Sequence, residues 1–117
     1  MIERFETSEK SSRVVKYNGV VYLSGLTPDD PDDDVAAQTR QILRKIDHFL
    51  ERAGTDKSRL LTGIVWTREI ENIPEINRIW EEWVPEGCAP ARTCARATPA
   101  RHQCLLEITV TAAAGAE

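Results

Sequence analysis

The segment CLLEITVTA, residues 104–112, constrains the fold more than any other part of the sequence, because its side chains alternate between apolar and polar. Successive side chains of a β-strand point to opposite faces of the sheet. One face of this strand therefore carries Cys104, Leu106, Ile108 and Val110. The other face carries Glu107, Thr109 and Thr111. Because the apolar set has to be covered, this strand belongs to a sheet with helices packed on one side.

Two segments have the periodicity of amphipathic helices that can supply this cover. The first starts where Asp33 or Asp34 can cap it, and it ends at Gly54. Its apolar stripe consists of Val35, Thr39, Ile42, Leu43, Ile46, Phe49, Leu50 and Ala53. The second starts near Asn72, with Pro74 in its first turn. Its apolar stripe consists of Ile73, Ile76, Trp80, Trp83 and Val84.

Four further segments complete the expected fold. Residues 13–17 and 20–24 flank Asn18-Gly19, a strong hairpin signal. LLTGIVWT, residues 60–67, is a strand with apolar side chains on both faces, and ARTCARA, residues 91–97, is a strand joined to residues 104–112 through TPARHQ. The order ββαβαββ predicts a single α+β domain over residues 1–117, with two helices on one face of a mixed sheet.

Composition narrows the class of partner. The net charge is −4 and the basic residues are scattered, which argues against a nucleic-acid surface. The first ten residues are charged throughout, and no apolar run approaches the length of a membrane span. We therefore expect a cytoplasmic protein that binds neither nucleic acid nor membrane, with its three cysteines reduced.

The face that carries Glu107 is expected to be a subunit interface. In the strand at 91–97, the small residues Ala91, Thr93 and Ala95 suit the helix side. Arg92, Cys94 and Arg96 would then join Glu107 on the other face. The strands at 20–24 and 60–67 each add apolar side chains to it. A face that is half apolar and half charged predicts association around a polar cleft.

The repeated tripeptide Pro-Ala-Arg, in PARTCARATPAR, presents two candidate arginines. Arg92 could hold a substrate carboxylate through two parallel hydrogen bonds. It could equally form a structural ion pair with Glu107, and spacing alone favours that alternative. Arg101 follows Pro99 in a connection and is expected to be a solvated turn residue. Arg96 would add positive field to the cleft or pair with an acid of a neighbouring chain.

The sequence does not predict a metal site. Cys88, Cys94, His102 and Cys104 lack the close pairing of zinc ligands. Cys94 as a nucleophile would need an activating histidine, so a small buried thiol is the expectation. The acidic run at residues 29–34 lacks the spacing of a calcium loop and is expected to be solvated.

Several motifs occur together from about Val14 to Ala113. They are NGVVYLSG, QTRQIL, TGIVWT, EIENIPEIN followed by W-x-x-W, PAR-T-C and LLEITVTA. In this combination the sequence resembles the RidA (YjgF) family of reactive-intermediate deaminases. The PAR-x-C element ahead of the Glu-Ile strand is the most specific part of the resemblance.

The resemblance implies a homotrimer with a central barrel-like core and clefts between subunits. It implies that Arg92 binds the carboxylate of a 2-imino or 2-enamino acid, and that the Cys94 backbone carbonyl meets the substrate nitrogen. Glu107 would position the attacking water, and Ser24 would line the pocket. No metal or organic cofactor is implied.

The sequence departs from the family pattern at three positions. Ser11 stands where many members have a pocket tyrosine, Leu26 stands where glutamine is usual, and Arg96 stands where an acid is common. The implied function is hydrolysis of short 2-imino or 2-enamino acids, such as 2-iminopropionate or 2-aminoacrylate, to 2-oxo acids and ammonia, which would detoxify reactive metabolites. Leu26 and the missing tyrosine favour the alternative, a non-catalytic trimer that binds carboxylate metabolites or a protein partner. A ribonuclease or translation-inhibitor function, attached to some members, is not favoured by the acidic charge balance.

Overall fold

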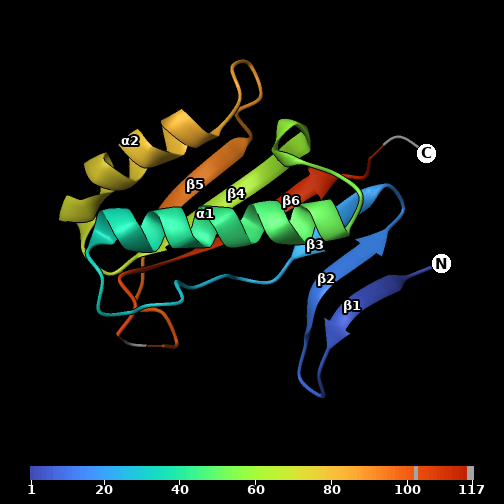
Figure 1. Cartoon of the computed structure of the whole chain (residues 1–117), viewed down its shortest axis with the longest axis horizontal. Coiled ribbons are helices and arrows are strands. Elements are labelled where there is room, and N and C mark those ends of the chain that lie inside the picture. Colours follow the sequence, from blue (N-terminus) through green and yellow to red (C-terminus); the bar gives the residue numbers. More distant parts are fainter. Residues whose placement is uncertain (102, 116–117) are drawn as a thin grey trace.

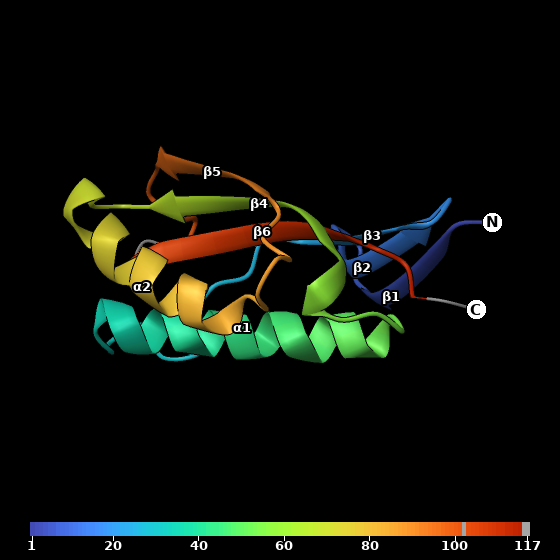
Figure 2. The ribbon, with the colours of Figure 1, turned by 90° about the horizontal axis from the view of Figure 1, so that it is seen from above.

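The protein folds into a six-stranded mixed sheet with helices on one face. The computed structural model describes residues 1–101 and 103–115. Helices α1 (Val35–Arg52) and α2 (Ile73–Trp83) lie side by side on the same face of the sheet (Figures 1 and 2). No helix packs over the other face in the described part of the chain, and we call this the open face (Figure 2). The predicted α+β architecture is confirmed.

The strands follow the order β1-β2-β3-β6-β4-β5 across the sheet. Their bounds are β1 Glu3–Thr7, β2 Ser12–Tyr17, β3 Val20–Leu23, β4 Leu60–Thr67, β5 Ala91–Arg96 and β6 Leu106–Ala113. Every neighbouring pair is antiparallel except β4 and β5, which are parallel. Two short 3₁₀ helices, η1 (Lys57–Arg59) and η2 (Ile70–Asn72), lie in the connections. The predicted order ββαβαββ lacked β1, whose side chains are exposed except for the partly buried Phe5, so it has no apolar set to reveal it.

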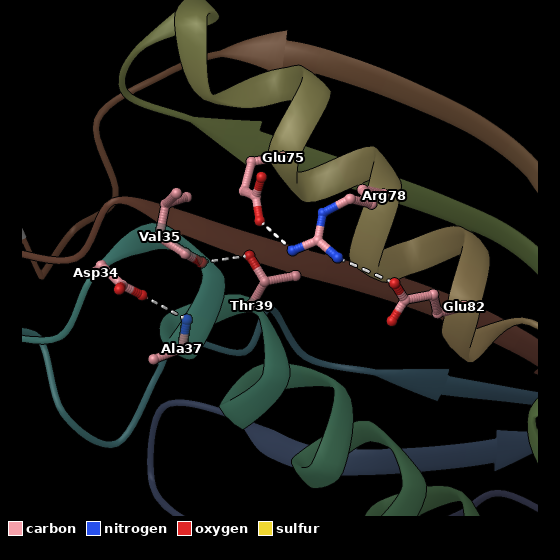
Figure 3. A network of polar contacts seen from close by, with 7 residues as sticks. All are labelled: Asp34, Val35, Ala37, Thr39, Glu75, Arg78 and Glu82. Atoms are coloured by element: carbon pink, nitrogen blue, oxygen red, sulfur yellow. Dashed lines mark hydrogen bonds and ion pairs between the residues drawn. The ribbon is translucent and has the colours of Figure 1, made fainter.

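Helix α1 begins and ends where the sequence predicted. The Asp34 side chain accepts a 2.8 Å hydrogen bond from the Ala37 amide and caps the first turn (Figure 3). Beyond the last turn, Gly54 has a φ of +80°, a conformation that glycine adopts without strain. The predicted apolar stripe of α1 packs on the sheet, with Ile42, Ile46 and Leu50 fully buried.

Helix α2 has two distinct faces. Ile76, Ile79 and Trp80 are buried against the sheet, and Ile79 was absent from the predicted stripe. On the outer face, Arg78 pairs with Glu75 and with Glu82, three residues before and four residues after it (Figure 3). No described helix is long and apolar enough to cross a bilayer.

The predicted pairing of the last two strands was wrong. Strands adjacent in sequence are often neighbours in a sheet, so residues 91–97 were expected beside residues 104–112. Instead β4 lies between β5 and β6, and β5 forms one edge of the sheet. The cause is the helix between β4 and β5, because a strand–helix–strand crossover returns the chain parallel to the strand it left.

The acidic loop before α1 is tied to the fold rather than simply solvated. Lys45 on α1 forms a 3.1 Å ion pair with Asp29. The fully buried Gln38 donates to the carbonyls of Pro31 and Asp33, and its side-chain oxygen accepts from the Leu105 amide. These bonds join the loop, α1 and the approach to β6.

Candidate active site

The strand register determines which face each candidate residue occupies. In β4, Gly63 and Val65 are buried toward the helices, so Ile64 and Trp66 point to the open face. Glu107 on β6 lies opposite Trp66 and therefore points to the open face, as predicted. Arg92 on β5 lies opposite Gly63 and points to the helix face. A Cβ on Gly63 would lie 3.7 Å from the Arg92 Cγ, which supports the same orientation.

The prediction that Arg92, Cys94 and Arg96 share a face with Glu107 was wrong. Cys94 lies opposite Val65 and packs against the core, and Arg96 lies opposite Thr67. The physical reason is that β5 is an edge strand, where a long side chain can lay its stem beneath α2. The small residues of β5 turn to the open face instead.

Helix α2 holds the Arg92 guanidinium in a fixed position. Its Nη2 atom donates a 2.6 Å hydrogen bond to Oδ1 of Asn77. The guanidinium carbon lies 5.3 Å from the centroid of the Trp80 ring, within the range of a cation–π contact. A Cβ on Gly63 would lie only 3.3 Å from Cη2 of Trp80, so the glycine gives the indole room against the sheet.

One nitrogen of Arg92 has no hydrogen-bond partner within residues 1–101 and 103–115. Nη1 is buried and donates no hydrogen bond to any of the described residues. None of the ion pairs of the described chain involves Arg92, so the alternative of an Arg92–Glu107 ion pair within one chain is wrong. A buried N–H without a partner costs free energy of about 1–3 kcal/mol, which a ligand acceptor would recover.

The backbone of Cys94 faces the free edge of the sheet. The Ala97 amide donates to the Thr67 carbonyl of β4 at 2.9 Å. Backbone groups of successive residues alternate between the two edges of a strand, so the amide and carbonyl of Cys94 point away from β4. That carbonyl therefore faces the free edge of the sheet, two residues after Arg92, and no bond from another described residue is directed to it by the strand pairing.

Glu107 belongs to a second cluster, on the open face. A Cβ on Gly25 would lie 2.0 Å from the Glu107 Oε2, so only glycine allows the carboxylate its place. No described residue forms a hydrogen bond or ion pair with this carboxylate. Next to it, Thr109 accepts a 3.3 Å hydrogen bond from the Trp66 indole. Ser24, beside Gly25, has a buried hydroxyl oxygen with no partner among the described residues.

Two of the three residues that depart from the family pattern, Ser11 and Leu26, have different surroundings. Ser11 is exposed in the turn between β1 and β2, at the opposite edge of the sheet from Arg92. Leu26 is buried in the core, and its backbone pairs with Ile108 through hydrogen bonds of 2.9 and 3.0 Å. The leucine therefore packs inside the subunit rather than lining the open face.

Arg101, in the second Pro-Ala-Arg copy, has a structural role. It is exposed, and its Nη1 donates to the Pro28 carbonyl at 3.0 Å and to the Thr27 hydroxyl at 3.2 Å. The expected solvated turn residue is thus tied to the loop before α1. The three cysteines are free thiols, while His102 lies outside the described residues.

Asn77 was the residue that sequence reasoning missed. On α2 it lies three residues before Trp80 and four after Ile73, which places an amide beside the apolar stripe. That interruption was a visible signal. Its partner Arg92, fifteen residues further along the chain, was not predictable without the strand pairing.

A groove of about 300 Å³ between α1 and α2 contains none of the candidate residues. Its lining includes both basic and acidic side chains, among them Arg40, Arg44, Asp47 and Glu82. Trp83 in this groove already donates to Asp47 and lies beneath Lys57. Because basic and acidic side chains line it together, the groove selects neither an anion nor a cation.

Comparison with known proteins identifies the family. The family model described as Endoribonuclease L-PSP matches residues 1–114. A crystal structure described as a member of the YjgF protein family, from Neisseria meningitidis, superposes with a TM-score of 0.96, at 34% identity, and covers 100% of this chain and 98% of that one. The chain belongs to the YjgF (RidA) family.

Two similar proteins carry different kinds of name, one a family name and the other an enzyme name. A RutC family protein from Haemophilus ducreyi is 39% identical over 113 residues, or 97% of each chain. A 3-aminoacrylate deaminase, RutC, from Acinetobacter baylyi is 34% identical over 99 residues, or 80% of this chain and 78% of the relative. The YjgF family thus includes an enzyme that is named for acting on an enamino acid.

Proposed function

We propose that this YjgF family protein hydrolyses short 2-imino and 2-enamino acids to 2-oxo acids and ammonia, and so removes reactive metabolites. The observation that carries the proposal is Arg92, a partly buried cation that has no carboxylate partner and one unpartnered nitrogen in the described part of the chain. Such a group fits the carboxylate of an amino-acid-derived substrate. The relative named as a 3-aminoacrylate deaminase supports an enamine or imine as the reacting part.

The reaction needs only modest help. Water adds to the C=N carbon to form a carbinolamine, which expels ammonia and leaves the 2-oxo acid. An enamine enters the same path after it tautomerises to the imine. Arg92 would fix the carboxylate, and the Cys94 carbonyl would accept from the substrate nitrogen. Orientation of the substrate and the water can lower the activation barrier by several kcal/mol. The upper range for well-aligned groups is about 7–11 kcal/mol.

Glu107 is proposed as the general base. Its carboxylate would take a proton from the attacking water and return it as ammonia leaves. The absence of a side chain at Gly25 lets this carboxylate lie directly against the backbone, and the neighbouring Ser24 hydroxyl has no partner among the described residues. No step requires the side chain of Ser11 or Leu26.

The proposed cleft lies between copies of the chain. Arg92 and Glu107 are on opposite faces of the same sheet, with β4 between their strands, so one small substrate can touch both only across an interface. The open face offers apolar side chains for such contact, including Ile64, Trp66 and the 46% exposed Tyr22. We propose a homotrimer of this kind, with its sheets forming a central core.

A second candidate is a non-catalytic binder of small carboxylates, formed by the same trimer. It requires Arg92 but not Glu107. It is favoured by the position of Ser11, whose short side chain cannot replace the contacts of a tyrosine. Substitution of Glu107 distinguishes the two candidate functions experimentally.

The deciding experiment generates 2-iminopropionate in situ with an amino-acid oxidase and traps the remaining imine with semicarbazide. The wild-type protein should accelerate loss of the imine. Arg92→Ala should abolish the acceleration, and Glu107→Gln should do so while leaving pyruvate binding intact. No acceleration by wild type with several amino acids, combined with pyruvate binding that needs Arg92, would establish the binder instead.

A further inference from the structure

The contact between Asn77 and Arg92 pairs a cation with a neutral acceptor. The amide oxygen takes a hydrogen bond from Nη2 at 2.6 Å but carries no net charge. The same position on α2 could hold an aspartate of nearly identical shape. That residue would neutralise the guanidinium, as Glu75 and Glu82 do for Arg78 one residue further along.

We propose that Asn77 is a positioning residue, which orients the Arg92 guanidinium while leaving its charge available to a substrate carboxylate. This inference rests on the proposed function, because it assumes that Arg92 binds the carboxylate. Ligand affinity should depend on a neutral amide at position 77, because a charged acceptor would compete with the ligand for Arg92.

Three contacts support this role. The Asn77 bond fixes one edge of the guanidinium, and the Trp80 ring centroid lies 5.3 Å from its central carbon. Gly63 leaves the space in which the indole packs. The hydrogen bond uses Nη2, and Nη1 stays buried and without a partner among the described residues. An arginine held in this way has lost its side-chain freedom before the ligand arrives, which raises affinity.

Exchange of the amide for a carboxylate separates orientation from charge. Asn77→Asp keeps the size and the acceptor, so Arg92 should stay in place and the melting temperature should not fall. The new negative charge, however, would compete with the ligand carboxylate for the same cation. We expect the affinity for the ligand to fall by about tenfold or more, the effect of a like charge beside a partly buried site.

Asn77→Ala provides the contrast, because it removes the acceptor without adding charge. The guanidinium would then lose its orientation, and we expect a smaller loss of affinity together with a lower melting temperature. Asn72→Asp is the matched control. It adds the same charge to the start of the same helix at a side chain that makes no capping hydrogen bond. It should change ligand affinity by about twofold at most.

The test measures pyruvate binding by titration calorimetry, the melting temperature, and kcat and KM with 2-iminopropionate. The expected result for Asn77→Asp is weaker pyruvate binding and a raised KM with an unchanged or higher melting temperature, while Asn72→Asp resembles wild type. A merely structural contact would not produce these opposite signs. If Asn77→Asp binds pyruvate as tightly as wild type, or loses binding only in step with stability, the inference is overturned.

Arg92→Ala distinguishes failure of the inference from failure of the function. If Arg92→Ala loses pyruvate binding and Asn77→Asp does not, only the role of Asn77 is wrong. If Arg92→Ala binds and hydrolyses as wild type does, the proposed function fails, and the role of Asn77 fails with it.

Discussion

Two arginines contact side chains of helix α2, and their contacts differ in kind. On its outer face Arg78 pairs with the carboxylates of Glu75 and Glu82 (Figure 3). On its inner face Asn77 meets Arg92 with an amide, and Trp80 packs beside the guanidinium. The outer arginine is exposed, and two carboxylates balance its charge. The inner arginine is partly buried, and no carboxylate of the described residues balances its charge.

This difference between the two arginines indicates which of them can bind an anionic ligand tightly. An exposed ion pair such as that of Arg78 is screened by water and contributes little to stability or binding. A cation that is partly removed from water, and that no acid neutralises, strongly favours an incoming anion. Among the described basic residues, Arg92 is distinguished by a buried side-chain nitrogen that has no hydrogen-bond partner.

The largest expected effect comes from replacing Arg92 with lysine, with the same replacement at Arg78 as the comparison. Lysine keeps the charge but cannot form the paired hydrogen bonds of a guanidinium. Arg92→Lys should lower kcat/KM for 2-iminopropionate by about tenfold or more, the value of one charged hydrogen bond. Arg78→Lys should leave it unchanged in the same assay. Equal behaviour of the two variants would remove the distinction between the arginines.

A smaller effect is expected from the two tryptophans of α2, each of which lies near a cation. Trp80→Leu should weaken pyruvate binding by roughly three- to tenfold, because it removes a cation–π contact of about 1 kcal/mol beneath Arg92. Trp83→Leu removes the ring beneath Lys57, which lies 5.2 Å away, and should leave pyruvate binding unchanged. Calorimetry on both variants checks the pair, and a loss with Trp83→Leu alone would point to the α1–α2 groove.

Arg101→Ala tests the other Pro-Ala-Arg copy. Its hydrogen bonds to Thr27 and Pro28 hold a loop, so their removal should lower the free energy of unfolding by about 1 kcal/mol at most. Imine hydrolysis should stay at the wild-type level. Chemical denaturation and the coupled assay give the two values, and loss of activity without loss of stability would show that the wrong arginine was chosen.

The smallest effect should come from Glu75→Gln. The hydrogen bond from Arg78 lowers the pKa of Glu75 from its ordinary value. The stabilisation is therefore present above the pKa of the unfolded chain and is lost as the pH falls through the lowered pKa of the folded state. Melting temperatures of wild type and Glu75→Gln should differ slightly near neutral pH and converge in acid, while activity stays unchanged. A difference that grows in acid would have the wrong sign.

The fold was largely predictable, and the reason is visible in β6. Leu106, Ile108 and Val110 are strictly alternate and are all buried, so one strand identified the helix face of the sheet. Helix α1 was equally clear, because a capping aspartate and a following glycine bracket a continuous apolar stripe. The family resemblance agreed with both.

The candidate site was less predictable, and β5 shows why. Its side chains form no apolar set, so alternation could not tell which face meets α2. The assumption that small residues face a helix fails at an edge strand, where the stem of Arg92 fits under the helix and its head is held by Asn77. Sequence therefore selected Arg92 and Glu107, while their separation on two faces emerged only from the strand order.

Arg92 and Glu107 are proposed to meet only across an interface between two copies of the chain. Co-refolding Arg92→Ala and Glu107→Gln chains in equal amounts tests it directly, with imine hydrolysis as the readout. Each variant alone should be inactive. Random mixing should restore about a quarter of the wild-type activity, because each cleft draws its two residues from different copies in a symmetric oligomer. Activity no higher than that of either inactive variant would place both residues in one subunit's site and contradict the account.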